Sequence, residues 1–240
     1  MKTLVYPSPL EVVRAMAELF IELSAAAIKE RKICNVSLSG GSSPKALYEL
    51  LQAGYCDKIN WSVMYFFFGD ERYVPFDDPQ SNGLMAKKAL FDPLHIKDDH
   101  IFYINTALPP AESAFDYEKR MVAHFEEKSV QFDIILLGLG DNAHTASLFP
   151  HTSVLHEKDA LIKEIFVKEV NQYRITFTAP LINNARNVIF LVYGKGKAQA
   201  VHQILEEERD FEMFPAQLIQ PVNGELFWVL DKAATELLHH

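Results

Sequence analysis

Cysteine and long apolar runs are scarce in this sequence. Its 240 residues include only two cysteines, Cys34 and Cys56, which are too few for the disulfide framework of a secreted scaffold and have no metal-ligand spacing. The opening residues lack the continuous apolar stretch of a secretory signal, and no uncharged run is long enough to span a membrane. We therefore expect a cytoplasmic protein without a membrane partner.

Positive charge is also in short supply. The chain carries 23 Lys and Arg against 32 Asp and Glu, a net charge of −9 at pH 7. An acidic chain disfavours nucleic acid and anionic membranes as partners. A small anionic substrate stays compatible with it, because a few local cations can reverse the field at one site. Since no repeat or linker-like stretch is present, we expect one domain spanning residues 1–240, as a monomer or a homodimer.

The common glycine signatures of nucleotide-binding proteins are missing as well. Residues 34–38 predict a strand and residues 44–51 a helix, but the turn between them matches neither G-x-x-x-x-G-K-S/T nor G-x-G-x-x-G. Its glycines, its hydroxyls and the free amides of the helix start can still hold a phosphate; a plain structural turn is the alternative. The turn residues are Gly40, Gly41, Ser42 and Ser43.

What the sequence does contain is a regular alternation of apolar, strand-like segments with amphipathic, helical ones. We expect strands at residues 3–6, 34–38, 61–68, 134–137, 187–193 and 225–230, and helices at 9–30, 44–51, 83–90, 111–128 and 195–208. This alternation predicts an α/β fold with a mostly parallel sheet flanked by helices. Residues 160–170 and 173–178 predict a small antiparallel strand pair in the second half.

One of these strands leads to the best candidate for chemistry. Residues 134–137 form a continuous apolar run between Asp133 and Gly138, as in a parallel strand buried on both faces. A glycine-rich turn follows and delivers His144 to the expected start of a short helix. Ligands bind beyond the carboxyl ends of parallel strands, so His144 is a candidate acid or base. The alternative is a histidine that only caps the helix.

Charged residues near other strand ends can complete such a site. Asp70, Glu71 and Arg72 follow the strand 61–68, either as a solvated turn or as a pocket wall. In a pocket wall, the Arg72 fork would bind an anion and a carboxylate would take a hydroxyl or a proton. Lys197 follows two glycines at a helix start, where cation and helix dipole can hold an anion together. Arg174 lies in mid-strand and faces either the site or water.

Five stretches together resemble a known family. They are SLSGGSSPKALYELL, FFFGDERYVPFDDPQSN, FDIILLGLGDNAHTASLFP, RITFTAPLINNARNVIFLVYGKGKA and PAQLIQPVNGELFWVLDKAA. In order and spacing they resemble the 6-phosphogluconolactonases, over nearly the whole chain. The resemblance implies a Rossmann-like α/β fold, shared with glucosamine-6-phosphate deaminase. It also implies hydrolysis of 6-phosphogluconolactone to 6-phosphogluconate in the pentose phosphate pathway, without a metal or another cofactor.

The resemblance also implies a set of site residues. It puts the catalytic histidine at His144 and the strand-end acid and arginine at Asp70 and Arg72. Where the family pattern has Asp-Gly before the histidine, this chain has Asn142 and Ala143, and an amide forms hydrogen bonds but supplies no charge. The full expected site comprises catalytic His144 and Asp70, with substrate-binding Gly40, Gly41, Ser42, Ser43, Arg72, Asn142, Arg174 and Lys197.

The expected mechanism makes His144 a general base. It deprotonates a water that attacks the lactone carbonyl, and the resulting imidazolium protonates the departing ring oxygen. The substrate phosphate provides binding energy remote from the reacting carbon. One alternative is an enzyme of the glucosamine-6-phosphate deaminase or isomerase type, although residues 145–150 offer no carboxylate for ring opening. The other is a non-catalytic phosphosugar-binding protein.

Overall fold

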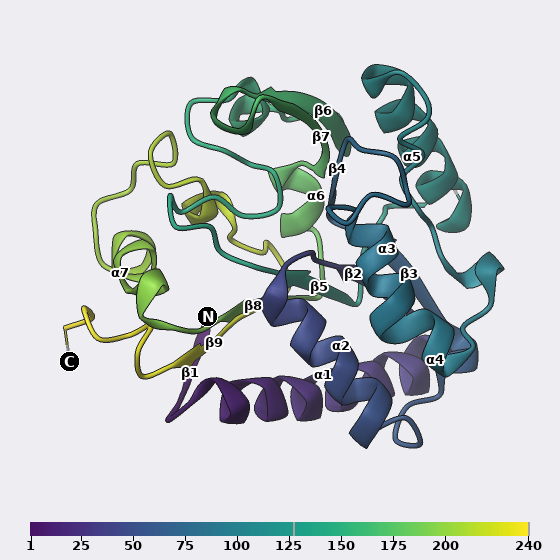
Figure 1. Cartoon of the computed structure of the whole chain (residues 1–240), viewed down its shortest axis with the longest axis horizontal. Coiled ribbons are helices and arrows are strands. Elements are labelled where there is room, and N and C mark those ends of the chain that lie inside the picture. Colours follow the sequence, from purple (N-terminus) through teal and green to yellow (C-terminus); the bar gives the residue numbers. More distant parts are fainter. Residues whose placement is uncertain (127, 240) are drawn as a thin grey trace.

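A parallel sheet forms the centre of the molecule, seen in a computed structural model that describes residues 1–126 and 128–239. Six strands pair in parallel in the order β1-β9-β8-β5-β2-β3 (Figure 1). They are β1 (Lys2–Tyr6), β2 (Cys34–Leu38), β3 (Met64–Phe68), β5 (Ile134–Leu137), β8 (Asn187–Val192) and β9 (Glu225–Asp231). The predicted α/β class with a mostly parallel sheet is confirmed.

Helices pack on this sheet and on a smaller one. The first, α1, starts at Pro9 after Ser8, whose hydroxyl oxygen accepts the amide of Glu11. Helices α1 and α2 lie side by side, and α5 packs on the smaller sheet (Figure 1). The helices are α1 (Pro9–Arg31), α2 (Ser42–Gly54), α3 (Asn82–Ala86), α4 (Asp92–Leu94), α5 (Pro110–His124), α6 (Ala179–Asn183) and α7 (Ala198–Leu205), with a π-helical turn, Lys87–Phe91, between α3 and α4.

The strand order contains a switch point between β2 and β5. From β2 the chain moves outward to β3, and it then returns to the other side of β2 to form β5 and, beyond it, β8. The loops that follow β2 and β5 therefore leave the same sheet edge in opposite directions. A crevice opens between such loops, and open α/β sheets bind their ligands there.

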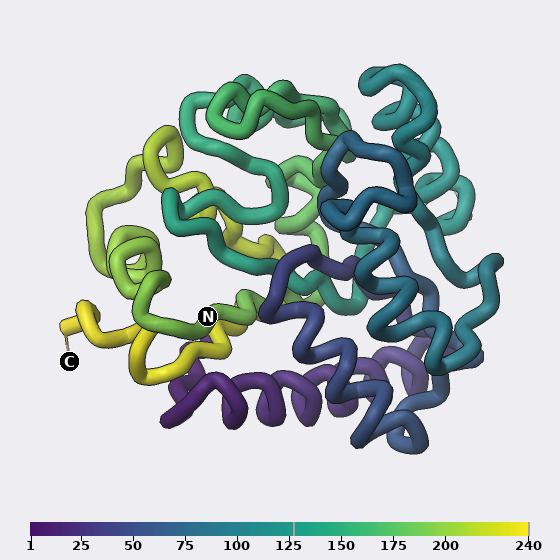
Figure 2. Tube along the Cα trace, viewed as in Figure 1, coloured from purple at the N-terminus to yellow at the C-terminus, as the bar shows by residue number. Residues whose placement is uncertain are grey.

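The second sheet has three antiparallel strands, β4 (Asp70–Arg72), β7 (Gln172–Phe177) and β6 (Ile162–Val167), in that order. The predicted antiparallel pair, β6 and β7, is confirmed, and β4 is a third strand that was not predicted. The charged segment that follows β3 is neither a solvated turn nor a loop, because it pairs with β7 and places Arg72 opposite Arg174. Figure 2 shows these two segments side by side although about a hundred residues separate them.

Several predicted helix boundaries are wrong. Helix α2 begins at Ser42, two residues earlier than expected, so both serines of the glycine turn belong to its first turn. His144 does not start a helix, because residues 141–150 form successive turns joined by a bridge between Thr145 and Leu148. The expected helix 195–208 is a 3-10 turn, Lys195–Lys197, followed by the shorter α7.

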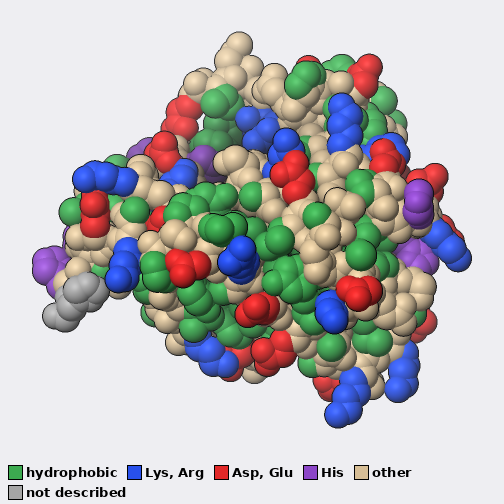
Figure 3. All heavy atoms as spheres, turned by 60° about the horizontal axis from the view of Figure 1, so that its bottom comes forward, with side chains coloured by type: hydrophobic (Ala, Val, Ile, Leu, Met, Phe, Trp, Pro, Cys, Tyr) green, Lys and Arg blue, Asp and Glu red, His purple; other side chains and the backbone are tan. Residues whose placement is uncertain are grey.

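The surface mixes both signs of charge. On the face that carries α1, acidic and basic side chains lie interspersed among hydrophobic ones (Figure 3). Among the residues that the structure describes, none of the helices has the length and apolar character needed to cross a membrane.

Candidate active site

A cavity opens at the switch point, at the carboxyl edge of the large sheet. Its volume is about 200 Å³, below the roughly 300 to 1,000 Å³ typical of sites for drug-sized ligands. Loops after β2, β5 and β8 meet there with β4 and β7 of the smaller sheet. Of the predicted site residues, those lining the cavity are Gly40, Gly41, Ser42, Ser43, Asp70, Arg72, His144, Arg174 and Lys197. The structure thus brings together residues from five separate segments, in a space suited to one small metabolite.

The loop after β5 fixes the ring of His144. The backbone amide of Gly140 donates to the His144 carbonyl oxygen over 2.8 Å, which folds the loop back on itself. A side chain at Gly140 would put its Cβ 2.0 Å from Nδ1 of His144, so only glycine fits. The imidazole stacks on Phe149, with ring centroids 4.0 Å apart and planes 17° from parallel. The histidine is therefore positioned by backbone and by aromatic packing.

Asn142 determines which nitrogen of His144 carries the proton. The Asn142 amide nitrogen donates to a carboxylate oxygen of Glu169 over 3.2 Å, and a carboxylate can only accept. The Asn142 carbonyl oxygen must then face His144, 2.5 Å from Nδ1, and accept the proton of that nitrogen. Nε2 is left with the lone pair. Asn142, expected to bind substrate, is not among the residues that line the cavity; its side chain contacts His144 and Glu169.

The environment of His144 favours the neutral ring. Burial lowers its pKa to about 4, since the imidazolium cation is poorly solvated at this position. The carboxylate of Asp70 opposes the shift, whereas the positive charges of Lys197 and Arg174 add to it. At pH 7 the ring is uncharged and Nε2 can accept a proton.

The two carboxylates of β4 have different surroundings. Asp70 lines the cavity, and one of its oxygens accepts the hydroxyl proton of Ser147 over 2.7 Å. Glu71 points the other way and accepts the backbone amides of Asn82 and Gly83, each over 2.8 Å, at the start of α3. Burial raises the pKa of Glu71, and these amide bonds oppose the shift. Asp70 is thus the carboxylate available to a ligand, and Glu71 holds β4 against α3.

The glycine turn offers hydrogen-bond donors to an anion. Gly41 has φ of 105°, a left-handed conformation that favours glycine, and it directs the first amides of α2 toward the cavity. A Cβ at Gly40 would lie 1.8 Å from the side-chain oxygen of Asn82. Asn82 in turn donates to the Asp70 carbonyl oxygen over 2.9 Å and so joins the turn to β4.

Cations reach the cavity from three elements. Arg174 on β7 is only 8% exposed, and its guanidinium donates to Gln172. Arg72, opposite it on β4, donates to the Gln80 carbonyl oxygen over 2.8 Å. Lys197, just before α7, forms an ion pair with Asp141. Burial and the neighbouring Arg72 both lower the pKa of Arg174, as expected where two cations face one space.

Three residues that hold Asp70 and Asn142 in place were not predicted from the sequence. Ser147, Asn82 and Glu169 contact Asp70 or Asn142, and each lies on a loop or a helix start. Ser147 and Asn82 are parts of the five family-like stretches, so a signal for them existed in the sequence. Glu169 has no such signal, because it approaches Asn142 from a turn between β6 and β7.

Comparisons with known proteins identify the family of this chain. Residues 7–228 match the family model described as "Glucosamine-6-phosphate isomerases/6-phosphogluconolactonase". A 6-phosphogluconolactonase of Synechocystis sp. is 44% identical over 216 residues, covering 88% of each chain. A 6-phosphogluconolactonase of Homo sapiens is 36% identical over 242 residues, covering 98% of this chain and 92% of its own.

A solved structure extends the likeness to three dimensions. The 6-phosphogluconolactonase from Trypanosoma cruzi superposes with a TM-score of 0.87 at 29% identity, over 99% of this chain and 96% of its own. The family match and both sequence relatives span nearly the full length, and the strand-end cavity falls within the matched residues. The chain therefore belongs to the glucosamine-6-phosphate isomerase/6-phosphogluconolactonase family.

Proposed function

We propose that this chain is a 6-phosphogluconolactonase, a hydrolase of the pentose phosphate pathway. One observation carries the proposal most directly: a neutral histidine with a free Nε2 lines the same small cavity as an anion-binding turn and three cations. Hydrolysis of a phosphorylated lactone needs this combination of a base with a holder for a distant phosphate. The relatives that carry the activity in their names match the chain almost end to end.

In the proposed reaction, Nε2 of His144 takes a proton from water as the water attacks the lactone carbonyl carbon. The tetrahedral intermediate carries negative charge on the former carbonyl oxygen, and amides of the glycine-rich loop or a neighbouring cation stabilise it. The imidazolium then returns the proton to the ring oxygen as the ring C–O bond breaks. The products are the open hydroxyl acid and the neutral histidine, so the base is regenerated in each turnover.

The phosphate is assigned to the turn after β2. We place it at the amides of Ser42 and Ser43, with Arg72, Arg174 and Lys197 as the surrounding cations. A helix N-terminus and cations attract the same dianion, so the phosphate anchors the substrate while the lactone end reaches His144. Asp70, which is fixed by Ser147, is the carboxylate left to accept a sugar hydroxyl.

Asn142 and Glu169 act as positioning residues in this scheme. Where the family pattern has an aspartate, this chain uses an amide, whose orientation the Glu169 carboxylate fixes. The amide holds His144 in the Nδ1–H tautomer without adding a charge that would raise its pKa. The working tautomer is thus retained although the aspartate is absent.

The assay must distinguish hydrolysis from the two alternatives. Freshly made 6-phosphogluconolactone is followed by acid release at neutral pH, against the spontaneous background and a His144→Ala control. Strong acceleration by the wild type alone supports the proposal. Tight binding without acceleration would favour a phosphosugar-binding protein, and ammonia release from glucosamine 6-phosphate would favour the deaminase class.

The compartment, the domain organisation and the oligomeric state of the chain are also proposals. We propose that the chain works in the cytoplasm as one domain, without a cofactor and without a nucleic-acid partner. Both cysteines are free thiols, one of them buried, which suits a reducing compartment. We propose a monomer or a homodimer, and a sedimentation measurement distinguishes the two.

A further inference from the structure

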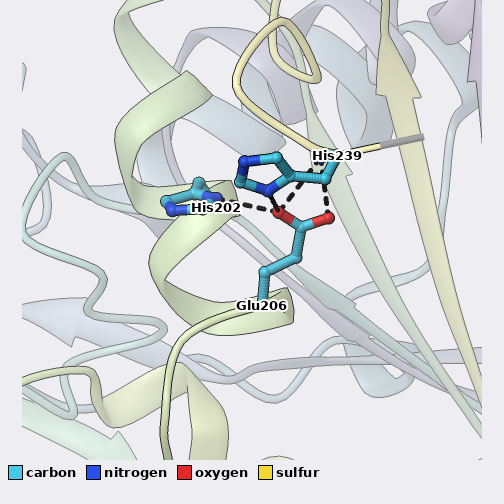
Figure 4. Close-up of side chains that lie close together, drawn as sticks. All are labelled: His202, Glu206 and His239. Carbon is cyan, nitrogen blue, oxygen red and sulfur yellow. Dashed lines mark hydrogen bonds and ion pairs between the residues drawn. The ribbon is translucent and has the colours of Figure 1, made fainter.

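A second histidine cluster lies outside the cavity. His202 and Glu206 stand one turn apart, at the end of α7 and just beyond it, and His239 reaches them from the C-terminal segment (Figure 4). None of them lines the cavity, and the proposed reaction makes no use of them. We propose that they bind one divalent transition-metal ion, with Zn²⁺ as the best-fitting ion.

The geometry of the donors supports this assignment. Nδ1 of His202 lies 3.0 Å from Oε2 of Glu206, and Nδ1 of His239 lies 2.9 Å from the same oxygen. Two donors on a tetrahedral zinc ion lie roughly 3.3 Å apart, because metal–ligand distances are about 2.0 to 2.1 Å. The ligand atoms of all three residues lie within 4.8 Å of one another, so small side-chain movements would bring three donors to one ion. The two rings flank the carboxylate, with planes 60° apart (Figure 4).

The surroundings supply the outer contacts that a metal site needs. The backbone amide of His239 donates to both carboxylate oxygens of Glu206, over 2.9 Å to Oε1 and 3.1 Å to Oε2, and both rings contact Oε2. Nε2 of His202 lies 3.8 Å from a carboxylate oxygen of Glu207, longer than a hydrogen bond, so Glu207 would have to move closer to accept the proton of this nitrogen. A carboxylate beside the second ring nitrogen is the usual partner of a metal-bound histidine, since it orients the ring and makes it a stronger donor.

The donor set also determines the class of ion. Two imidazole nitrogens and one carboxylate oxygen suit zinc, copper or nickel, whereas magnesium and calcium need oxygen ligands. With three protein ligands, the fourth position belongs to water, and His239 is 85% exposed, so solvent reaches the ion directly. Such a site would tie the C-terminal segment to α7.

Calorimetry on the full, tag-free chain tests the proposal. After treatment with chelator and dialysis, the protein is titrated with ZnCl₂ in a buffer that does not bind zinc. We expect saturation at one Zn²⁺ per chain, and no saturation at the same concentrations for His202→Ala or His239→Ala. Glu207→Gln should weaken binding by about tenfold, the usual effect of losing an outer-shell partner.

A matched surface pair serves as the control. His156 lies 2.6 Å from Glu212 but has no second histidine at that carboxylate among the described residues, so His156→Ala should bind Zn²⁺ like the wild type. Lactone hydrolysis by every variant, measured without added zinc, checks that the fold is intact. A wild type that does not saturate, or a His202→Ala variant that binds as tightly as wild type, would overturn the assignment.

Discussion

His144 differs from the pair formed by His202 and His239 in the group that its ring contacts. The ring of His144 is partly buried, stacked on an aromatic side chain and hydrogen bonded to a neutral amide. The ring of His202 is also partly buried and that of His239 is exposed, and these two rings share a carboxylate. A neutral partner in a poorly solvated site keeps a histidine uncharged and available as a base, whereas a carboxylate partner favours either a proton or a metal ion. The hydrogen-bond partner of a histidine and its solvation therefore determine whether the ring acts as a base or binds a proton or a metal ion.

Removing the buried base should have the largest effect. His144→Ala is expected to lower kcat on 6-phosphogluconolactone by about 10²- to 10⁴-fold, the range that general-base catalysis contributes. His202→Ala should leave kcat unchanged, because that ring lies outside the cavity. Initial rates corrected for spontaneous hydrolysis measure both. Near wild-type turnover in His144→Ala would show that another group is the base.

The next prediction concerns Arg174, whose positive charge lowers the pKa of His144 and belongs to the proposed phosphate site. Arg174→Ala should cost on the order of 2 to 4 kcal/mol in kcat/KM, as for the loss of a buried charge-assisted contact. The loss should fall mainly on KM, and added inorganic phosphate should inhibit this variant less than the wild type. Arg209→Ala, at an exposed position, is the control and should change neither constant. If both constants stay unchanged in Arg174→Ala, the phosphate does not bind there.

A carboxylate beside His144 would give its ring the kind of partner that His202 and His239 have. With a neutral amide beside it, the pKa of His144 is about 4, so activity should persist as the pH falls below 6. Asn142→Asp adds a carboxylate that stabilises the imidazolium, and the acidic limb of kcat/KM should move up by roughly 1 to 2 pH units. Buffered stopped-flow assays between pH 4 and 7.5 record the limb. A limb in the same place would show that Asn142 does not set the protonation of His144.

The smallest expected effect concerns Glu169, which accepts a hydrogen bond from the Asn142 amide. Glu169 is exposed, so the contribution of its bond to Asn142 is limited to about 1 kcal/mol or less. Glu169→Gln should lower kcat by about two- to fivefold at pH 7 and leave KM unchanged, since the amide is then free to flip and present its NH₂ to His144. Glu164→Gln on the neighbouring strand is the control. An equal loss in both variants would indicate a general effect on β6 rather than positioning.

The sequence predicts the large sheet well because its strands are rich in apolar residues, and β5 and most of β8 are continuous apolar runs. It does not predict β4, whose three residues Asp70, Glu71 and Arg72 have no apolar pattern and become a strand only by pairing with β7. The turns around His144 depend on distant contacts too: the amide of Ala216 donates to the carbonyl oxygen of Ala143 over 3.0 Å. Local patterns predict which segments bear the site residues, and tertiary contacts determine how those residues are oriented.

The edge of the large sheet has a consequence for how the protein is made. β1 pairs with β9, and Lys2 lies opposite Phe227, so this pairing joins residues more than 200 positions apart in the sequence. Contacts of this sequence separation slow folding, because the chain must close a long loop before they form. A nascent chain still attached to the ribosome carries β1 and α1 with an unpaired sheet edge, and such edges are open to wrong pairing. Completion of the sheet, in which β9 lies between β1 and β8, therefore has to follow the synthesis of β9.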